Sequence, residues 1–106
     1  MKFVFLGGAV AGILLFSPFA SASVELARSK NCMTCHALDK KIIGPSLNDV
    51  SLKYANDKSA ESKLVAKVLS GGSGAWGTIP MPPSRQVSEA EAQILVRWIL
   101  ALKEKP

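Results

Sequence analysis

The sequence predicts an all-α fold in a single small domain. Apolar residues recur at helical spacing in the segments 60–69 and 94–102, and Ser59 and Ser88 stand where they can cap these helices. No segment shows the polar and apolar alternation of a half-buried strand. The chain has only 106 residues, so its core is limited unless another apolar group adds to it.

The N-terminus has the pattern of a secretory signal peptide. Lys2 provides a positive start, residues 3–16 are uncharged and apolar, Pro18 interrupts this run, and residues 20–22 read Ala-Ser-Ala. We therefore predict cleavage after Ala22, with a mature domain over residues 23–106. The competing interpretation is an uncleaved membrane anchor, but a span needs about 20 apolar residues and this run is shorter.

The first half of the mature domain is predicted to contain two short helices. Ser23 can cap a helix over residues 24–30 that leads into a cysteine-containing motif. Residues 37–46 have the composition of a loop and end in Gly-Pro-Ser. A short helix over residues 47–54 follows.

The second half is predicted to contain two longer helices separated by a loop. Ser59 would cap a helix over residues 60–69, whose apolar stripe is formed by Leu64, Val65, Val68 and Leu69. Residues 71–84, rich in glycine and proline, form a long loop of the kind that is often functional.

The last helix is the best defined of the four. Ser88 and Glu91 have the spacing of a capping box. Its buried face is expected to consist of Ile94, Leu95, Trp98, Ile99 and Leu102. We assign Trp98 to core packing.

The motif Cys32-Met33-Thr34-Cys35-His36 is typical of covalent attachment of one haem c. Each cysteine can form a thioether with a haem vinyl carbon, and the histidine is then placed to ligate the iron. Structural zinc would lack a ligand, because about four are needed. Thiol–disulfide exchange would need a βαβ context that the sequence does not show. A disulfide across two residues would constrain little.

The second axial ligand can be sought by elimination. His36 is the only histidine, so two histidine ligands within one chain are excluded. Met1 is removed with the signal peptide, and Met33 lies inside the attachment motif. Met81 remains, between prolines that make its segment extended and stiff. Thioether sulfur is a soft ligand for haem iron. Lysine ligation is the fallback.

The charge of the chain is moderately basic. It has 13 Lys and Arg against 8 Asp and Glu, a formal net charge of +5. An ordinary solvated surface and electrostatic steering toward an acidic redox partner both fit this charge. Nucleic-acid binding is improbable in an exported chain whose lysines alternate with acidic residues. The lysines that could form a basic rim are Lys30, Lys40, Lys41, Lys58, Lys63 and Lys67.

The region from residue 23 to 106 resembles a small class I bacterial cytochrome c of the c-551/c-552 type. The motifs that carry the resemblance are the haem motif at 32–36, Gly44-Pro45-Ser46, and the segment 76–83, which reads Trp-Gly-Thr-Ile-Pro-Met-Pro-Pro. The resemblance implies four to five helices wrapped around one covalent haem, with the first and last helices packed crosswise.

The resemblance also implies roles for three further residues. The Pro45 carbonyl would accept a hydrogen bond from the His36 Nδ1–H and fix the orientation of this ring. The Trp76 indole, together with Lys67, would contact a haem propionate. Relatives often carry arginine at the position of Lys67, and a lysine cannot pair in a bidentate fork. Several relatives have asparagine at the position of Ser84, where it hydrogen-bonds near the ligating sulfur. The serine side chain is shorter and has a single hydroxyl donor.

The function implied is electron transfer and not enzymatic catalysis. With both axial positions filled, the iron has no open site for a substrate, which suits a soluble periplasmic carrier. The resemblance suggests a bc1-type complex as donor and a terminal oxidase or nitrite reductase as acceptor. We expect a monomer with no stable membrane insertion. The alternatives are a small haem peroxidase or a gas sensor, if Met81 does not bind iron, and a thiol–disulfide oxidoreductase.

Overall fold

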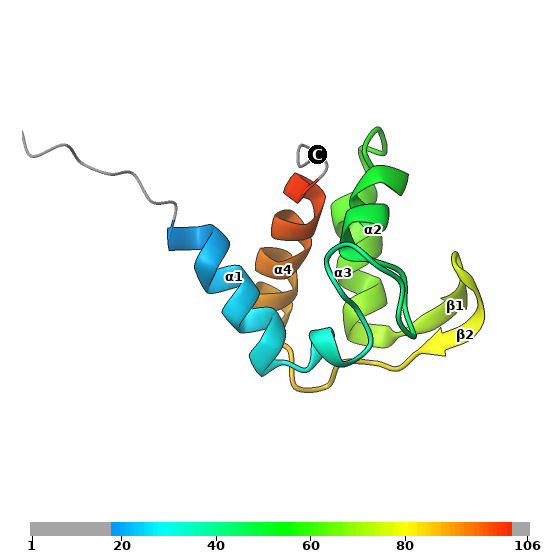
Figure 1. The fold of residues 1–106 in the computed structure, drawn as a ribbon, viewed down its shortest axis with the longest axis horizontal. Helices are drawn as coiled ribbons and strands as arrows, with labels where there is room; N and C mark the ends of the chain where they lie inside the picture. The colour runs from blue at the N-terminus through cyan, green and yellow to red at the C-terminus, as the bar shows by residue number, and fades with distance from the viewer. Residues whose placement is uncertain (1–17, 103–106) are drawn as a thin grey trace, which may run out of the picture.

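The computed structural model describes residues 18–102. The fold is mostly helical, with four α-helices, one short 3-10 helix and one small β-hairpin in this range (Figure 1). The predicted helical class with four to five helices is confirmed. The elements in chain order are α1 (Pro18–Ser29), η1 (Cys32–Thr34), α2 (Leu47–Lys53), α3 (Ala60–Ser70), β1 (Gly72–Gly74), β2 (Gly77–Met81) and α4 (Glu89–Ala101).

Helix α1 begins earlier than the sequence pattern predicts. It starts at Pro18, so Ser23 lies inside the helix, where it is buried, and does not cap it. The physical reason is that proline suits the first helical turn and the residues between Pro18 and Ser23 do not interrupt a helix. Most of the predicted signal peptide, residues 1–17, lies outside the described residues.

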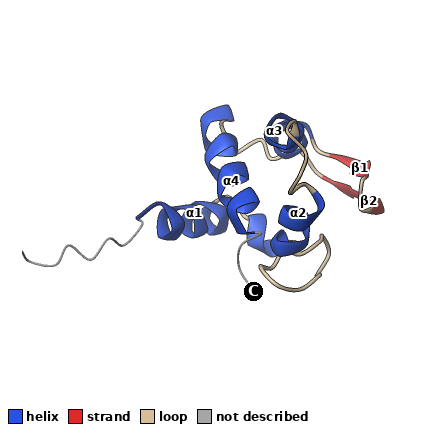
Figure 2. Cartoon of the chain, turned by 90° about the horizontal axis from the view of Figure 1, so that it is seen from above, coloured by secondary structure: helices blue, strands red, loops and turns tan. Residues whose placement is uncertain are grey.

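Helices α1 and α4 cross and pack against each other, as Figures 1 and 2 show from two directions. Helix α4 begins with the predicted capping box. The Glu91 amide donates to Ser88 Oγ at 3.1 Å, and the Ser88 amide donates to Glu91 Oε1 at 3.0 Å. These two bonds satisfy amides that a helix start leaves unpaired, and they fix where α4 begins.

Helices α2 and α3 pack on other faces of α4. Ser46 caps α2 by accepting the Asp49 amide at 3.0 Å. The buried Ser51 hydroxyl of α2 donates to the Leu100 carbonyl of α4 at 3.2 Å. Helix α3 is linked to α4 by the ion pair between Glu61 and Arg97.

Ser59 occupies the predicted N-cap position of α3, but its side chain does not cap the helix. The hydroxyl donates instead to Asp57 Oδ1 at 2.6 Å. Asp57 also accepts the Lys63 ammonium at 2.8 Å. This cluster, with the Lys63 bond as its largest cause, lowers the pKa of Asp57 to about 2.

The expectation of no strands is wrong for the loop after α3. Strands β1 and β2 form an antiparallel hairpin in which Gly72 pairs with Met81 and Gly74 pairs with Gly77. Nearly all residues of both strands are exposed. A strand without a buried face has no polar and apolar alternation, so this hairpin leaves no periodic signal in the sequence.

The apolar core lies between α1, α3 and α4 and is small. The predicted stripe of α3 is confirmed, because its members are buried or packed against the core. On α4, Ile94 is 50% exposed, contrary to prediction, whereas Val96 is fully buried. Val96 lies one turn after the buried Ala92, so the buried face is rotated away from Ile94. The core cluster consists of Ala27, Val65, Val87, Ala92, Leu95 and Val96.

Among the helices of residues 18–102, none combines the length and the apolar character needed to cross a bilayer.

Candidate functional site

One cavity of about 680 Å³ collects all seven residues that the sequence singled out. Pockets for small molecules and cofactors commonly measure roughly 300–1,000 Å³, so its size suits a prosthetic group. Two segments far apart in the sequence contribute most of these residues. We call them the attachment loop (residues 31–46) and the hairpin arm (residues 71–87). The seven residues are Cys32, Cys35, His36, Pro45, Lys67, Trp76 and Met81.

The attachment loop leaves α1 through a sharp turn. Asn31 adopts the left-handed conformation at φ 66°, which asparagine tolerates better than most residues. The 3-10 turn η1 follows and carries Cys32 at its start. Neither cysteine forms a disulfide, and both line the cavity. The turn therefore brings both thiols to the same space.

The Cys32 thiol does not have the lowered pKa of an attacking redox cysteine. Burial raises the pKa of the Cys32 thiol above its usual value, and a backbone hydrogen bond offsets part of this effect. Thiol–disulfide oxidoreductases need a lowered pKa at the attacking cysteine. Within residues 18–102, no three His, Cys, Asp or Glu side chains lie close enough together to hold a metal ion. Among the described residues, the motif therefore shows neither a zinc ligand cluster nor a disulfide, and Cys32 lacks the lowered pKa of an attacking thiol.

The His36 ring is held by two contacts with the end of the attachment loop. Its Nδ1 lies 2.7 Å from the Pro45 carbonyl oxygen. A carbonyl only accepts, so Nδ1 donates, and in the neutral ring Nε2 then carries the lone pair that a metal needs. The ring also packs against Gly44, where a Cβ would lie 2.6 Å from His36 Cε1. Only glycine allows this approach.

Backbone hydrogen bonds close the attachment loop onto itself. The Gly44 amide donates to the Cys35 carbonyl at 2.8 Å, and the Leu47 amide donates to the Ala37 carbonyl at 2.9 Å. These bonds place Pro45 beside His36 and lead directly into α2.

The hairpin arm carries Met81 at the end of β2. Met81 is half-buried, whereas the preceding residues of β2 are exposed. Gly71 begins the arm at φ 71°, and a Cβ there would press against the Met81 carbonyl oxygen. After Met81, the Ser84 amide donates to the Val68 carbonyl of α3 at 2.9 Å. Met33, by contrast, packs against the core and does not line the cavity.

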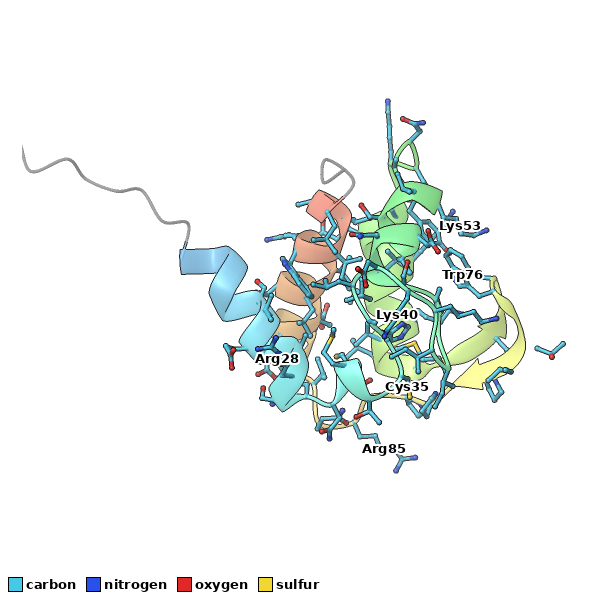
Figure 3. The ribbon with its side chains drawn as sticks, viewed as in Figure 1. Arg28, Cys35, Lys40, Lys53, Trp76 and Arg85 are labelled. Atoms are coloured by element: carbon cyan, nitrogen blue, oxygen red, sulfur yellow. The ribbon has the colours of Figure 1, made fainter. Side chains whose placement is uncertain are left out.

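Trp76 and Lys67 also line the cavity. Trp76, in the turn between β1 and β2, is 45% exposed. Figure 3 shows it reaching toward Lys53 of α2, whose Nζ lies 5.1 Å from the centre of the Trp76 ring. The Lys67 Nζ lies against Gly72, where a Cβ would be 2.8 Å away. No sequence pattern links Lys53 to Trp76, and this contact was not predicted.

The comparison with known families decides the identity of the chain. The family model described as “Cytochrome c” matches residues 20–103. The chain belongs to the cytochrome c family. The resemblance inferred from the sequence motifs is thereby confirmed.

Several proteins are similar to this cytochrome c over most of its length. Cytochrome c-552 of Nitrosomonas europaea is 45% identical over 103 residues, covering 97% of this chain and 100% of that protein. Cytochrome c-551 of Azotobacter vinelandii is 51% identical over 79 residues, covering 74% of this chain and 95% of that protein. Cytochrome c-551 of Pseudomonas aeruginosa is 40% identical over 95 residues, covering 90% of each chain.

Solved structures share the fold of this cytochrome c. The crystal structure of Nitrosomonas europaea cytochrome c552 superposes with a TM-score of 0.73 at 46% identity, covering 76% of this chain and 99% of that one. The class 1 cytochrome MtoD of Sideroxydans lithotrophicus gives a TM-score of 0.64 at 34% identity, covering 77% and 94%. The fold is therefore the class I cytochrome c fold, as predicted.

The residues of the cavity fit a haem group. Apolar side chains of α3 and α4, including Leu64, Val68 and Ile99, offer the surface that a flat macrocycle needs. Two thiols are available for covalent attachment, and one imidazole nitrogen is free. This cytochrome c is accordingly a monohaem electron-transfer protein with one covalently bound haem c, held through Cys32 and Cys35. Its partners are redox proteins.

Proposed function

We propose that this cytochrome c is a soluble periplasmic electron carrier, not an enzyme, with His36 and Met81 as the axial ligands of its iron. The observation that carries the proposal is the 2.7 Å hydrogen bond from His36 Nδ1 to Pro45, which leaves only Nε2 for a metal. Met81 lines the same cavity and supplies a soft sulfur ligand. Two protein ligands leave the iron no position for a substrate.

Each of the seven site residues has a defined task in this proposal. When bound, haem supplies a one-electron Fe(III)/Fe(II) couple. Cys32 and Cys35 hold it covalently, and Pro45 keeps the His36 ring in one orientation and one tautomer. Lys67 and the indole N–H of Trp76 would bind a propionate. A rigid site changes little between oxidation states, which favours fast electron transfer.

We further propose that residues 1–22 are a signal peptide that is removed after Ala22. The pattern of this segment and the covalent haem support export to the periplasm. Helix α1 would then begin at Ser23, which is buried in the described structure. N-terminal sequencing of the protein from the periplasmic fraction tests this, and a mature chain that begins at Met1 would contradict it.

We infer that the partners are a bc1-type complex as donor and a terminal oxidase or nitrite reductase as acceptor. Removal of Lys2 with the signal peptide leaves 12 Lys and Arg against 8 Asp and Glu, and this net charge of +4 supports attraction to acidic surfaces. The rate of reduction by an acidic partner should therefore fall as ionic strength rises. We expect the carrier to act as a monomer, which light scattering of the purified protein would test.

The ligation is tested by spectra of the holoprotein. The oxidised protein should show the weak far-red absorption band that a methionine–iron(III) bond gives, and Met81→Leu should remove it. Met33→Leu is the matched control, because Met33 packs on the core away from the cavity. A far-red band that survives Met81→Leu would overturn the assignment. Absence of the band from the unaltered oxidised protein would favour a lysine, three of which line the cavity: Lys30, Lys41 and Lys67.

Carbon monoxide distinguishes the carrier from a peroxidase or gas sensor. Because both axial positions are filled, the reduced protein should bind the gas slowly and incompletely at neutral pH. Rapid, complete binding would favour the alternatives, which need an open coordination position.

A further inference from the structure

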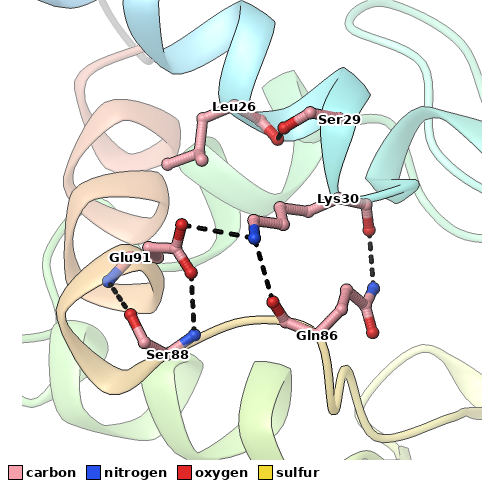
Figure 4. A network of polar contacts seen from close by, with 6 residues as sticks. All are labelled: Leu26, Ser29, Lys30, Gln86, Ser88 and Glu91. Carbon is pink, nitrogen blue, oxygen red and sulfur yellow. Dashed lines mark hydrogen bonds and ion pairs between the residues drawn. The ribbon is translucent and has the colours of Figure 1, made fainter.

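A reciprocal pair of hydrogen bonds joins the end of α1 to the hairpin arm (Figure 4). The Lys30 ammonium donates to the Gln86 backbone carbonyl at 3.0 Å. The Gln86 side-chain amide donates to the Lys30 backbone carbonyl at 2.6 Å. Lys30 Nζ also lies 3.4 Å from Glu91 Oε2 in the capping box of α4. We call the two reciprocal bonds the Lys30–Gln86 pair.

Helix geometry explains why these groups meet. The last carbonyls of a helix have no partner within it, and the Gln86 amide satisfies the one at Lys30. A cation is favoured near the C-terminus of α1, and an anion near the N-terminus of α4. The Lys30 and Glu91 side chains are only 25% and 31% exposed, so solvent screens this contact less than a fully exposed one.

The Lys30–Gln86 pair lies between the two parts of the proposed haem site. Lys30 stands two positions before Cys32, and Gln86 stands five positions after Met81. Both residues line the cavity. The pair thus links the residue just before the attachment loop to a residue shortly after Met81, the proposed sulfur ligand.

The segment between Met81 and α4 is anchored in the core by Val87 but has few other polar attachments to the helices. Its one other backbone bond to a helix outside the arm, among the described residues, is from the Ser84 amide to Val68. Pro82 and Pro83 have no amide to donate. A displacement of Met81 away from the cavity would therefore be opposed by the Ser84 bond, by the burial of Val87 in the core cluster and by the Lys30–Gln86 pair.

We propose that the Lys30–Gln86 pair is a positioning device that keeps Met81 at the iron. This inference rests on the proposed function, because it assumes that Met81 is the axial ligand. Lys30 and Gln86 do not touch the iron; they act by holding the arm that carries the ligand. Breaking the pair raises the fraction of protein in which Met81 is dissociated.

Free imidazole measures that fraction in the oxidised holoprotein, because it binds iron only where Met81 has left. Gln86→Met removes the amide donor at similar length, and Lys30→Met removes the ammonium. Since a typical hydrogen bond shifts an equilibrium by about five-fold, each variant should bind free imidazole about five-fold more tightly. Lys30→Arg retains a donor and should restore affinity to near the original value.

Ser51→Ala is the control for general loss of stability. It removes the hydrogen bond between α2 and α4 at a buried position that does not line the cavity. When variants with the same loss in urea midpoint are compared, Ser51→Ala should leave the affinity for free imidazole unchanged within about two-fold. The double variant Lys30→Met/Gln86→Met should show less than the product of the two single effects, because both remove parts of one pair.

The results separate the failure of this inference from the failure of the proposed function. If the unaltered oxidised protein lacks the far-red band, methionine ligation is wrong and the inference falls with it. If the band is present but Gln86→Met and Ser51→Ala change the affinity equally, the ligation stands and the positioning role is overturned. The positioning role is supported if Gln86→Met and Lys30→Met raise the affinity for free imidazole more than Ser51→Ala does, and if Lys30→Arg restores it to near the original value.

Discussion

The attachment loop and the hairpin arm form the same cavity, but they are held in different ways. Bonds between residues close in sequence fix the attachment loop, such as His36 to Pro45 and Gly44 to Cys35. The hairpin arm is exposed along most of β1 and β2. It is attached to the rest of the molecule by contacts with distant residues, such as Val68 and Lys30.

This difference indicates which of the two proposed ligands is easier to displace. A histidine held by its own loop stays in place when helices elsewhere loosen. A methionine on an exposed hairpin moves whenever its distant contacts break. The following predictions test this contrast.

The largest effect is expected for Gly71→Ala in the hairpin arm. A Cβ there would press against the Met81 carbonyl oxygen and lie 2.8 Å from Pro83 N, at a backbone φ of 71°. Overpacking and left-handed strain together should lower the free energy of unfolding by about 3 kcal/mol. Urea unfolding measures this loss, and the far-red band should weaken with it.

Gly74→Ala is the control for backbone strain alone, because it has φ 108° and no atom within 4 Å of a Cβ. It should cost about 1–2 kcal/mol and leave the far-red band intact. Equal effects of the two variants would show that contact with Met81 is not what matters.

Gly44→Ala should have the next largest effect, this time on the attachment loop. The added Cβ would lie 2.6 Å from His36 Cε1 and 2.9 Å from Nδ1, so the ring must leave the position in which it bonds Pro45. We expect a loss of about 2 kcal/mol in unfolding free energy. Exchange of the His36 Nδ1 proton, followed by NMR, should accelerate, whereas it should stay slow in Gly71→Ala. Loss of the far-red band in Gly44→Ala would mean that the two regions are coupled.

A smaller effect is expected from acid. The Ser88 amide, and then the Lys30 ammonium, lower the pKa of Glu91 below its usual value. A lowered pKa means that this stabilisation is complete above the unfolded value of 4.5 and is lost as pH falls through the folded one. Glu91→Gln should therefore be less stable than the original protein at neutral pH and equal to it in acid, as unfolding at several pH values would measure.

Asp57→Asn provides the comparison for Glu91→Gln. The pKa of Asp57 is about 2, and its cluster lies away from the Lys30–Gln86 pair. The Asp57→Asn variant should alter the acid dependence of stability without altering the affinity for free imidazole. A change in that affinity would contradict the contrast between the two regions.

The smallest effect is expected for Lys53→Met. Its ammonium lies over the Trp76 ring at 5.1 Å, and exposed contacts of this kind contribute about 0.5–1 kcal/mol. The far-red band should be unchanged, because the contact is at the hairpin turn and not at Met81. Lys58→Met, at an exposed position outside the haem cavity, is the control for loss of one positive charge.

The sequence predicted the parts of the molecule that depend on local chemistry. Ser88 and Glu91 form the predicted capping box of α4, because a capping side chain needs only its next few neighbours. The seven residues of the site were found from the attachment motif, from elimination among the methionines and from the family resemblance. The cavity contains all seven.

The errors arise where tertiary contacts or exposed backbone decide the outcome. Ser23 is inside α1 because the helix continues from Pro18, and Ile94 is exposed because α4 is rotated toward Val96. The hairpin has no buried face, so no alternation marks it. The contact of Lys30 with Gln86 joins positions 56 apart, which no local pattern could indicate.

That separation also sets an order in time. Closing a long loop has a larger entropic cost than closing a short one, and the bonds of the attachment loop span only a few residues. A chain that emerges from its N-terminus can therefore shape the loop around His36 while residues beyond Met81 are still absent. We expect haem attachment to begin at this partly formed site, and the packing of α4 to complete the cavity as the last step.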